Sequence, residues 1–163
     1  MTVLESRVDA DALTLTFVTE FDATPERVWQ LWEDPRQLER WWGPPTWPAS
    51  FPEHEFVPGG RSHYFMTGPD GSQVHGWWRI IAIDEPRRLE FDDGFADAEG
   101  RPVEGNPVRG IATLEGRDGR TRMTCLMTFA DAADLEKLME MGMREGMGLA
   151  LGQIDDILAG VHA

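Results

Sequence analysis

The strongest constraint on the fold is one long segment with helical periodicity at the C-terminal end, residues 131–158. Asp131 can cap a helix there. Apolar side chains then recur at helical spacing, namely Met143, Met147, Ala150 or Leu151, Ile154 and Leu158. The other predicted helices are short, so this helix has to cover the apolar face of the strands that precede it.

Four glycines interrupt the same segment, at positions 142, 146, 148 and 152. Each glycine costs a helix interior about 1 kcal/mol relative to alanine. The glycines therefore predict a close backbone approach or space left beside the helix. The alternative is a break near Gly142, with the packing helix beginning after it.

The chain before this helix is dominated by strand patterns. Residues 13–19 alternate apolar and polar side chains and predict a first strand. Thr24-Pro25 and Asp34-Pro35 then give two helix-start signals, each a capping residue followed by a proline at the first helical position. From residue 51 onward we expect five or six antiparallel strands, among them 61–67, 89–91, 108–115 and 120–129.

A predicted hairpin sets the register of two of these strands. Gly68-Pro69-Asp70-Gly71 has the residues of a type I turn followed by a bulge, which closes Gly68 against Ser72. The inner face of the hairpin then pairs large residues with small ones. Its pairs are Met66 with Val74, Tyr64 with Gly76, and Ser62 with Trp78.

Residues 92–107 form an acidic segment rich in glycine and proline. We expect a loop here, longer than is usual in a compact domain and therefore functional. Because the acidic residues concentrate on this loop and on turns, we expect them to lie on a solvated surface.

Composition excludes several classes of function. The chain has 163 residues, 15 basic and 29 acidic, for a net charge of −14. Such a charge repels phosphate backbones and anionic lipid surfaces, so we do not expect nucleic acid binding. The longest apolar run, around residues 77–83, is interrupted by Arg79, so we expect no membrane insertion. The sequence shows no secretory signal, and its single cysteine, Cys125, fits a reducing cytoplasm. We expect one domain over residues 1–163, with its core at about 13–159.

Several motifs, in this order, resemble a known family. They are Ala23-Thr24-Pro25 with Val28 and Trp29; Trp32, Asp34-Pro35 and Leu38; Trp41-Trp42-Gly43-Pro44; Pro58-Gly59-Gly60-Arg61; Pro86, Leu89 and Phe91; and Gly142-Met143, Gly146, Ile154 and Leu158. Over residues 13–159 the chain resembles the START-like helix-grip superfamily, in the branch of activators of heat-shock-protein ATPase. One departure is Met147, where the family often has tryptophan after the glycine, and it affects the shape of the pocket floor.

The resemblance implies an α+β fold. A curved antiparallel sheet wraps around a long C-terminal helix, and two short helices follow the first strand. It also implies a cavity between sheet and helix, which the superfamily uses for hydrophobic or amphipathic ligands, but it implies no particular reaction. We therefore expect non-covalent binding of a small hydrophobic or amphipathic molecule. The expected contact residues are Tyr64, Met66, Trp78, Phe91, Met123, Met127, Met143 and Met147, with Trp42 or Trp47 at the entrance.

Each of these residues also has a purely structural interpretation. Tyr64 either orients a ligand or is a core aromatic with a satisfied hydroxyl. The methionines either line an adaptable pocket or fill an irregular core. Trp42 and Trp47 either gate the pocket or close the end of the sheet. Cys125 is expected to be a buried, inert thiol.

The histidines give no clear metal site. His63 and His75 would lie diagonally across the hairpin, but a zinc site needs three or four ligands and no third is apparent. We interpret both as surface histidines, and His54 equally so. The sequence predicts no catalytic set, no metal and no cofactor.

Two other functions stay open at this stage. A cyclase or hydrolase would need an ionisable group within reach of the cavity, with Tyr64 the first candidate. A chaperone-interaction module would use the acidic surface to contact a basic partner. A homodimer is compatible with a domain of this kind, although no part of the sequence specifies an interface.

Overall fold

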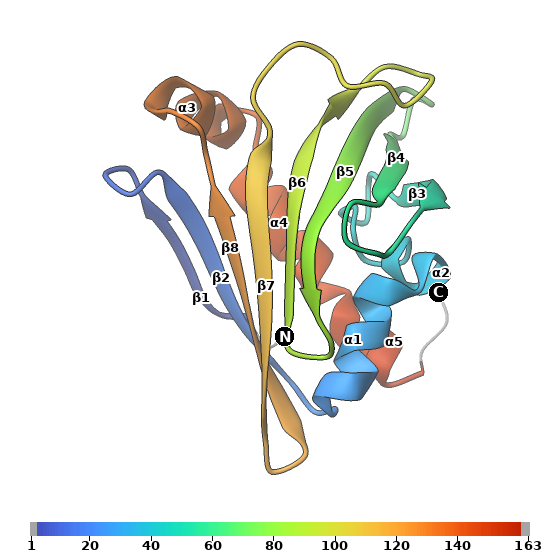
Figure 1. The fold of residues 1–163 in the computed structure, drawn as a ribbon, viewed down its shortest axis with the longest axis vertical. Coiled ribbons are helices and arrows are strands. Elements are labelled where there is room, and N and C mark those ends of the chain that lie inside the picture. The colour runs from blue at the N-terminus through green and yellow to red at the C-terminus, as the bar shows by residue number, and fades with distance from the viewer. Residues whose placement is uncertain (1–2, 161–163) are drawn as a thin grey trace.

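One antiparallel sheet of eight strands forms the body of the protein (Figure 1). The computed structural model describes residues 3–160; the two ends of the predicted domain, 1–2 and 161–163, lie outside the described residues. The strands lie in the order β1-β2-β8-β7-β6-β5-β4-β3. Their bounds are β1 Val3–Asp9, β2 Thr14–Phe21, β3 Ala49–His54, β4 Arg61–Thr67, β5 Gln73–Asp84, β6 Arg88–Ala96, β7 Val108–Arg117 and β8 Arg120–Thr128.

The two predicted short helices follow β2 and begin at the predicted caps. In α1 (Pro25–Glu33) the Thr24 side chain accepts a hydrogen bond from the amide of Arg27 at 3.3 Å. In α2 (Pro35–Leu38) the Asp34 carboxylate accepts from the amide of Arg36 at 2.9 Å. A proline at the first helical position loses no hydrogen bond, because that amide has no acceptor within the helix.

The C-terminal helical segment is broken, as the alternative interpretation predicts. It consists of α3 (Ala132–Glu140), α4 (Met143–Gly152) and α5 (Ile154–Leu158). Gly142 separates α3 from α4 and has a φ of 86°, a left-handed conformation that favours glycine. In Figure 1, α4 crosses the sheet, while α3 lies at one end and α5 at the other, near α1.

The predicted hairpin register is confirmed. The amide of Gly68 donates to the carbonyl of Ser72 at 2.8 Å, and Tyr64 lies opposite Gly76 across β4 and β5. Gly76 is needed for its lack of a side chain, since a Cβ there would lie 2.2 Å from Cζ of Tyr64. The tyrosine ring therefore lies flat across β5.

Two of the predicted boundaries are wrong. The strand predicted at 13–19 is the second one, because β1 precedes it and pairs with it at the edge of the sheet. β1 has mainly exposed side chains and so lacks the alternation that reveals a half-buried strand. The loop predicted at 92–107 begins only after Ala96, because β6 continues to that residue and pairs with β5 throughout.

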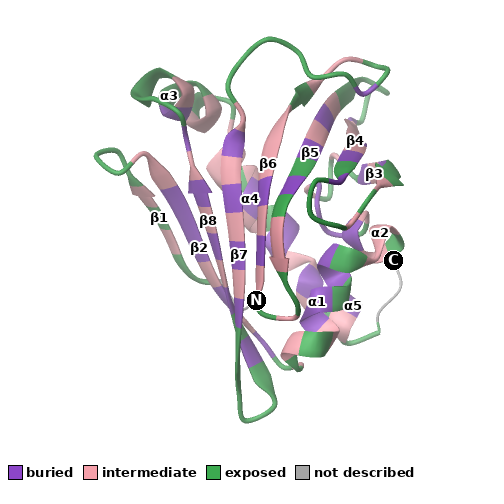
Figure 2. Ribbon diagram, in the orientation of Figure 1, coloured by how far each residue is buried: buried purple, intermediate pink, exposed green. Residues whose placement is uncertain are grey.

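An aromatic cluster fills the end of the sheet beneath α1 and α2. Trp32 packs edge-on against Trp41, with ring centroids 4.8 Å apart, and Trp42 packs in the same way against Trp78 at 4.8 Å. Phe91 adds a further ring 4.4 Å from Trp78. Figure 2 shows this core as buried residues along the central strands and on the inner side of α1.

The segment Trp41-Trp42-Gly43 is tied to the C-terminal helices by one side chain. Gln153, between α4 and α5, donates its amide to the carbonyl of Gly43 at 2.7 Å. Gly43 cannot carry a side chain, since a Cβ would lie 2.0 Å from the carbonyl oxygen of Trp47. The conformation of this segment is therefore fixed by contacts with the fold on both sides.

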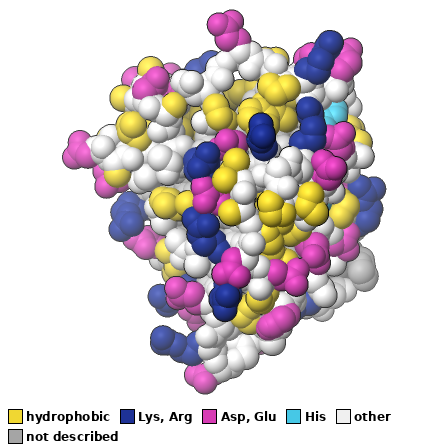
Figure 3. Space-filling view, viewed as in Figure 1, with side chains coloured by type: hydrophobic (Ala, Val, Ile, Leu, Met, Phe, Trp, Pro, Cys, Tyr) yellow, Lys and Arg dark blue, Asp and Glu magenta, His cyan; other side chains and the backbone are white. Residues whose placement is uncertain are grey.

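The outer face of the sheet carries charges of both signs (Figure 3). Arg109 on β7 pairs with Glu90 and Asp92 on β6, each at 2.6 Å. Among residues 3–160, no helix is long and apolar enough to cross a membrane.

Two glycine-to-alanine variants test the break in the C-terminal segment. Gly142→Ala should lower the free energy of unfolding by about 1 kcal/mol or more, because alanine is strained at a φ of 86°. Gly148→Ala should raise it by roughly 0.5–1 kcal/mol, because Gly148 lies within α4 and a Cβ there meets only Phe17, at 3.7 Å. Urea denaturation followed by circular dichroism measures both. Changes of the same sign would contradict the left-handed break.

Candidate functional site: an apolar cavity with a tyrosine–aspartate pair

A cavity of about 250 Å³ lies between the sheet and the junction of α3 with α4. Its walls come from the inner faces of β4, β6, β7 and β8, from the segment after α2, and from the helices. Among its residues Phe95, Asn106 and Met141 are exposed and mark its rim. The full lining is Trp42, Pro44, Tyr64, Met66, Asp93, Gly94, Phe95, Asn106, Val108, Met127, Leu138, Met141, Gly142, Met143, Gly146 and Met147.

The polar end of the cavity is a hydrogen bond between two strands that are not neighbours. The Tyr64 hydroxyl on β4 donates to Oδ1 of Asp93 on β6 at 2.7 Å. β5 lies between these strands, and the ring crosses it over Gly76. Asp93 points inward because its cross-strand partners, Trp78 on β5 and Val108 on β7, are both buried in the core.

Burial decides the ionisation of this pair. It raises the pKa of Asp93 to about 7, and the hydrogen bond from Tyr64 acts in the opposite direction. Burial, and after it the nearby carboxyl of Asp93, raise the pKa of Tyr64 well above 10. Near neutral pH, Asp93 therefore exists in both protonated and ionised forms, while Tyr64 keeps its proton.

One carboxylate oxygen of the pair is left without a partner in the described part of the protein. Within residues 3–160, Oδ2 of Asp93 accepts no hydrogen bond from the protein. The indole Nε1 of Trp42 is fully buried, and its interaction with the Tyr64 hydroxyl opposes the rise in the pKa of that tyrosine. In the part of the chain that the structure describes, no arginine, lysine or histidine lines the cavity.

Six of the ten residues predicted to contact a ligand line this cavity. Trp42 and Tyr64 form one wall, and Met127 lies at its base on β8. The other three are Met66, Met143 and Met147. The cavity lining is therefore rich in methionine.

The other four lie elsewhere. Trp78, Phe91 and Met123 are buried in the aromatic cluster, with at most 1% of each residue exposed. Met123 accepts the indole N–H of Trp32 on its sulfur at 3.4 Å. Trp47 packs over Gly68, where a Cβ would lie 2.6 Å from its ring, and it is absent from the cavity wall.

Asp93 is the most important residue that the sequence analysis missed. The expectation that the acidic residues of 92–107 lie on a solvated surface is wrong for Asp93, which β6 directs into the interior. A signal was present, because Leu89, Phe91, Asp93 and Phe95 occupy alternate positions on one face of a strand. Phe95, Asn106, Val108, Leu138 and Met141 of the lining were also missed.

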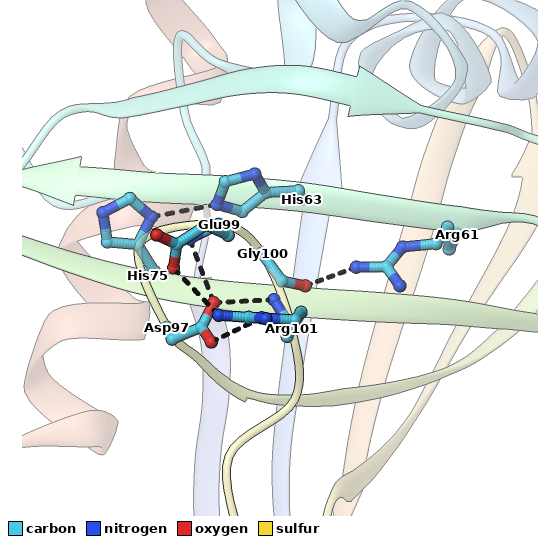
Figure 4. Close-up of polar contacts among 7 residues, drawn as sticks. All are labelled: Arg61, His63, His75, Asp97, Glu99, Gly100 and Arg101. Carbon is cyan, nitrogen blue, oxygen red and sulfur yellow. Dashed lines mark hydrogen bonds and ion pairs between the residues drawn. The ribbon is translucent and has the colours of Figure 1, made fainter.

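His63 and His75 form a hydrogen-bonded pair beneath the turn at residues 97–101 (Figure 4). Nε2 of His63 and Nδ1 of His75 lie 2.9 Å apart, and the ring centroids 5.1 Å apart. The nitrogens thus face one another along the line joining the rings instead of converging on a common ion. Residues 3–160 contain no group of three or more histidine, cysteine or acidic side chains that could hold a metal.

This pair is half-buried, so its interpretation as surface histidines is wrong. Gly100 packs on the His63 ring, and Arg61 donates to the Gly100 carbonyl. Asp97 closes the turn by accepting the amides of Glu99 at 2.9 Å and Arg101 at 3.0 Å. Burial, and next the neighbouring His75, lower the pKa of His63.

His54 and Cys125 have structural surroundings. His54 bridges Ser62 Oγ at 2.7 Å and the carbonyl of Trp32 at 2.9 Å, and burial lowers its pKa, so it too is no surface histidine. Cys125 is buried, as expected, and burial raises the pKa of its thiol to about 12. That thiol is protonated at neutral pH and unsuited to nucleophilic attack.

Comparison with known proteins gives a consistent result. The sequence model of the family described as activator of Hsp90 ATPase homolog 1-like protein matches residues 22–159. A protein from Arthrobacter aurescens, solved by solution NMR, is similar at 52% identity with a TM-score of 0.93, over 98% of this chain and 93% of that one. Protein Ms6760 from Mycobacterium smegmatis is similar at 44% identity with a TM-score of 0.90, over 99% of both chains.

A more distant structure shares the fold alone. DynU16, a putative protein in the dynemicin biosynthetic locus, has 17% identity and a TM-score of 0.62, over 90% of this chain and 47% of that one. No curated protein shows a significant match to the chain.

The raised pKa of Asp93 predicts how stability depends on pH. Between about pH 4 and pH 7 the unfolded chain carries an ionised Asp93 and the folded protein a protonated one, so rising pH favours unfolding. Asp93→Asn removes this titration. The free energy of unfolding of the wild type minus that of Asp93→Asn should therefore fall by about 2 kcal/mol from pH 5 to pH 7.

Denaturant titrations at several pH values measure this difference. Asp118→Asn is the matched control, because Asp118 is exposed in the turn between β7 and β8. A difference that is independent of pH for Asp93→Asn, or equal for both variants, would contradict the burial of this carboxyl.

Proposed function

Because the chain belongs to the activator of Hsp90 ATPase homolog 1-like family, whose START-like fold is suited to ligand binding, we propose that it binds a small, mainly hydrophobic molecule non-covalently. The observation that carries this proposal is the cavity of about 250 Å³ with apolar walls and one polar pair. An interior of this kind is the usual form of a small-molecule site.

The cavity volume limits the size of the ligand. An apolar cavity of roughly 150 Å³ accommodates benzene, so about 250 Å³ suits on the order of ten non-hydrogen atoms. Bicyclic aromatic compounds and short branched chains have this size. A full-length lipid chain would extend beyond the rim.

The walls differ in their adaptability. Met66, Met127, Met143 and Met147 have unbranched, flexible side chains that adjust to ligands of different shape. The Tyr64–Asp93 pair is fixed by strand register and offers a polar anchor. This combination favours ligands that are apolar over most of their surface and polar at one end.

The tyrosine–aspartate pair also supports a second candidate, an acid–base enzyme of the cyclase or hydrolase type. A carboxyl with a pKa of about 7 inside an apolar cavity is suited to proton transfer at neutral pH. Incubation of each bound molecule with the protein, followed by mass spectrometry, distinguishes the two functions. Unchanged ligand supports binding alone, and a product that is lost in Tyr64→Phe supports the enzyme. The chaperone-interaction module, the homodimer and the cytoplasmic location stay predictions.

A variant that fills the cavity tests the proposed site. Gly146 lines the cavity on α4, and a Cβ there has no neighbour within 4 Å. Gly146→Leu should occupy the space and weaken the binding of naphthalene at least tenfold, with thermal stability maintained. Ligand-observed NMR measures the binding.

Gly148→Ala is the matched control on the same helix, because Gly148 does not line the cavity. It should bind naphthalene as the wild type does. Equal binding by Gly146→Leu and the wild type would place the apolar site elsewhere.

A further inference from the structure

We infer that this cavity selects ligands that carry a cationic amine and discriminates against carboxylates and phosphates. The inference rests on the proposed function and specifies its ligand class. Its starting point is the set of charged groups in and around the cavity.

Among the described residues, the cavity lining has one acidic side chain and no basic one. Tyr64 and Asp93 are the only ionisable residues within 3–160 that line it. An anionic ligand would have no cation to pair with inside an apolar site, which is costly. It would also face Asp93 at close range, in a protein with a net charge of −14.

Basic residues on the surrounding elements are engaged elsewhere. Arg144 on α4 donates to the Ser6 hydroxyl on β1 at 2.9 Å and to the Ser6 carbonyl at 2.6 Å. Arg109 on β7 pairs with Glu90 and Asp92 on the outer face of the sheet. Neither arginine lines the cavity.

Other charged groups on these elements also stay outside the cavity lining. On β4, Arg61 pairs with Glu53 at 2.9 Å. The remaining charged residues on the adjoining elements are Arg79 and Asp84 on β5, Arg88 on β6, Glu115 and Arg117 on β7, Arg120 and Arg122 on β8, Asp134, Glu136, Lys137 and Glu140 on α3, and Glu145 on α4. Tyr64 is thus the one titratable group in contact with Asp93 among the described residues.

The hydrogen-bonding pattern at the polar end favours a donor. The Tyr64 proton is committed to Oδ1 of Asp93, so the hydroxyl offers the ligand only its lone pairs. Oδ2 of an ionised Asp93 likewise only accepts. An ammonium group, with three N–H donors and a positive charge, complements both atoms.

The aromatic walls favour the same ligand. Trp42 and Tyr64 lie edge to face with centroids 6.1 Å apart, and Phe95 stands at the rim. A cation near aromatic faces is attracted by the negative face of the rings, most strongly when it is desolvated. Neutral alcohols gain nothing comparable from these rings.

Three probes with one skeleton separate charge from hydrophobicity. They are 2-(2-naphthyl)ethylamine, 2-(2-naphthyl)ethanol and 2-naphthylacetate, which are cationic, neutral and anionic near neutral pH. Dissociation constants of the wild type at pH 6, 7 and 8, from isothermal titration calorimetry, give the ranking. We expect the amine to bind at least tenfold more tightly than the alcohol at pH 8, and the acetate to bind most weakly.

The pH dependence should differ in sign between the probes. Ionised Asp93 binds the amine, and the pKa of this carboxyl is about 7, so amine affinity should rise about tenfold from pH 6 to pH 8. The acetate requires the protonated carboxyl, so its affinity should fall by a similar factor. The alcohol should change little.

Two variants identify the group responsible. Asp93→Asn should reduce amine affinity to that of the alcohol and abolish the pH dependence. Asp118→Asn removes an exposed acid and leaves the cavity intact, so it should bind all three probes as the wild type does. A loss of amine affinity in Asp118→Asn as large as in Asp93→Asn would attribute the preference to net charge and overturn the inference.

The order of the probe affinities in the wild type tests the amine preference separately from the proposed hydrophobic ligand site, and it needs no variant. Equal affinities for the three probes, or tightest binding of the acetate, would overturn the amine preference and leave the hydrophobic ligand site standing. Absence of binding by all three probes and by naphthalene would overturn the proposed function itself.

Discussion

The packing of tryptophan rings beneath α1 and α2 determines which part of the interior is a packed core and which part is left as a cavity. The curved sheet is wider than one helix can cover, so side chains have to fill the remainder of its inner face. Trp32, Trp41 and Trp78 fill the end nearest α1, with the ring centroids of Trp32 and Trp41 4.8 Å apart. The opposite end has methionines and glycines instead, and there the cavity of about 250 Å³ is left.

The position of Asp93 shows how an acid in the wall of an apolar cavity is tolerated in this fold. A carboxyl in an apolar interior is costly unless it is neutral or hydrogen-bonded. Tyr64 provides the hydrogen bond, and it reaches Asp93 only because the strand between them has glycine at position 76. Residues on three strands, β4, β5 and β6, are therefore needed to hold the Asp93 carboxyl in place.

Sequence patterns were sufficient wherever the information was local. The caps at Thr24 and Asp34 and the register of the β4–β5 hairpin follow from neighbouring residues, and the structure confirms them. Asp93 could not be identified so easily, because an acid next to glycines is typical of a loop and only pairing with β5 and β7 directs it inward. For Phe91 and Met123 the inner face was correctly predicted, but the division of that face between solid core and cavity depends on how the rings pack in three dimensions.

The glycine at position 76 also affects how rigid the walls of the cavity are. Because the Tyr64 ring lies against the backbone at Gly76 and its hydroxyl is hydrogen-bonded to Asp93, the position of that hydroxyl is fixed by contacts with two neighbouring strands, β5 and β6. The wall that carries Met143 and Met147 belongs to α4, which begins after Gly142 in its left-handed conformation. The wall with Tyr64 is therefore rigid, and the wall with Met143 and Met147 can adapt its shape. Molecules that share a head group could be held at the same point while their tails differ in shape.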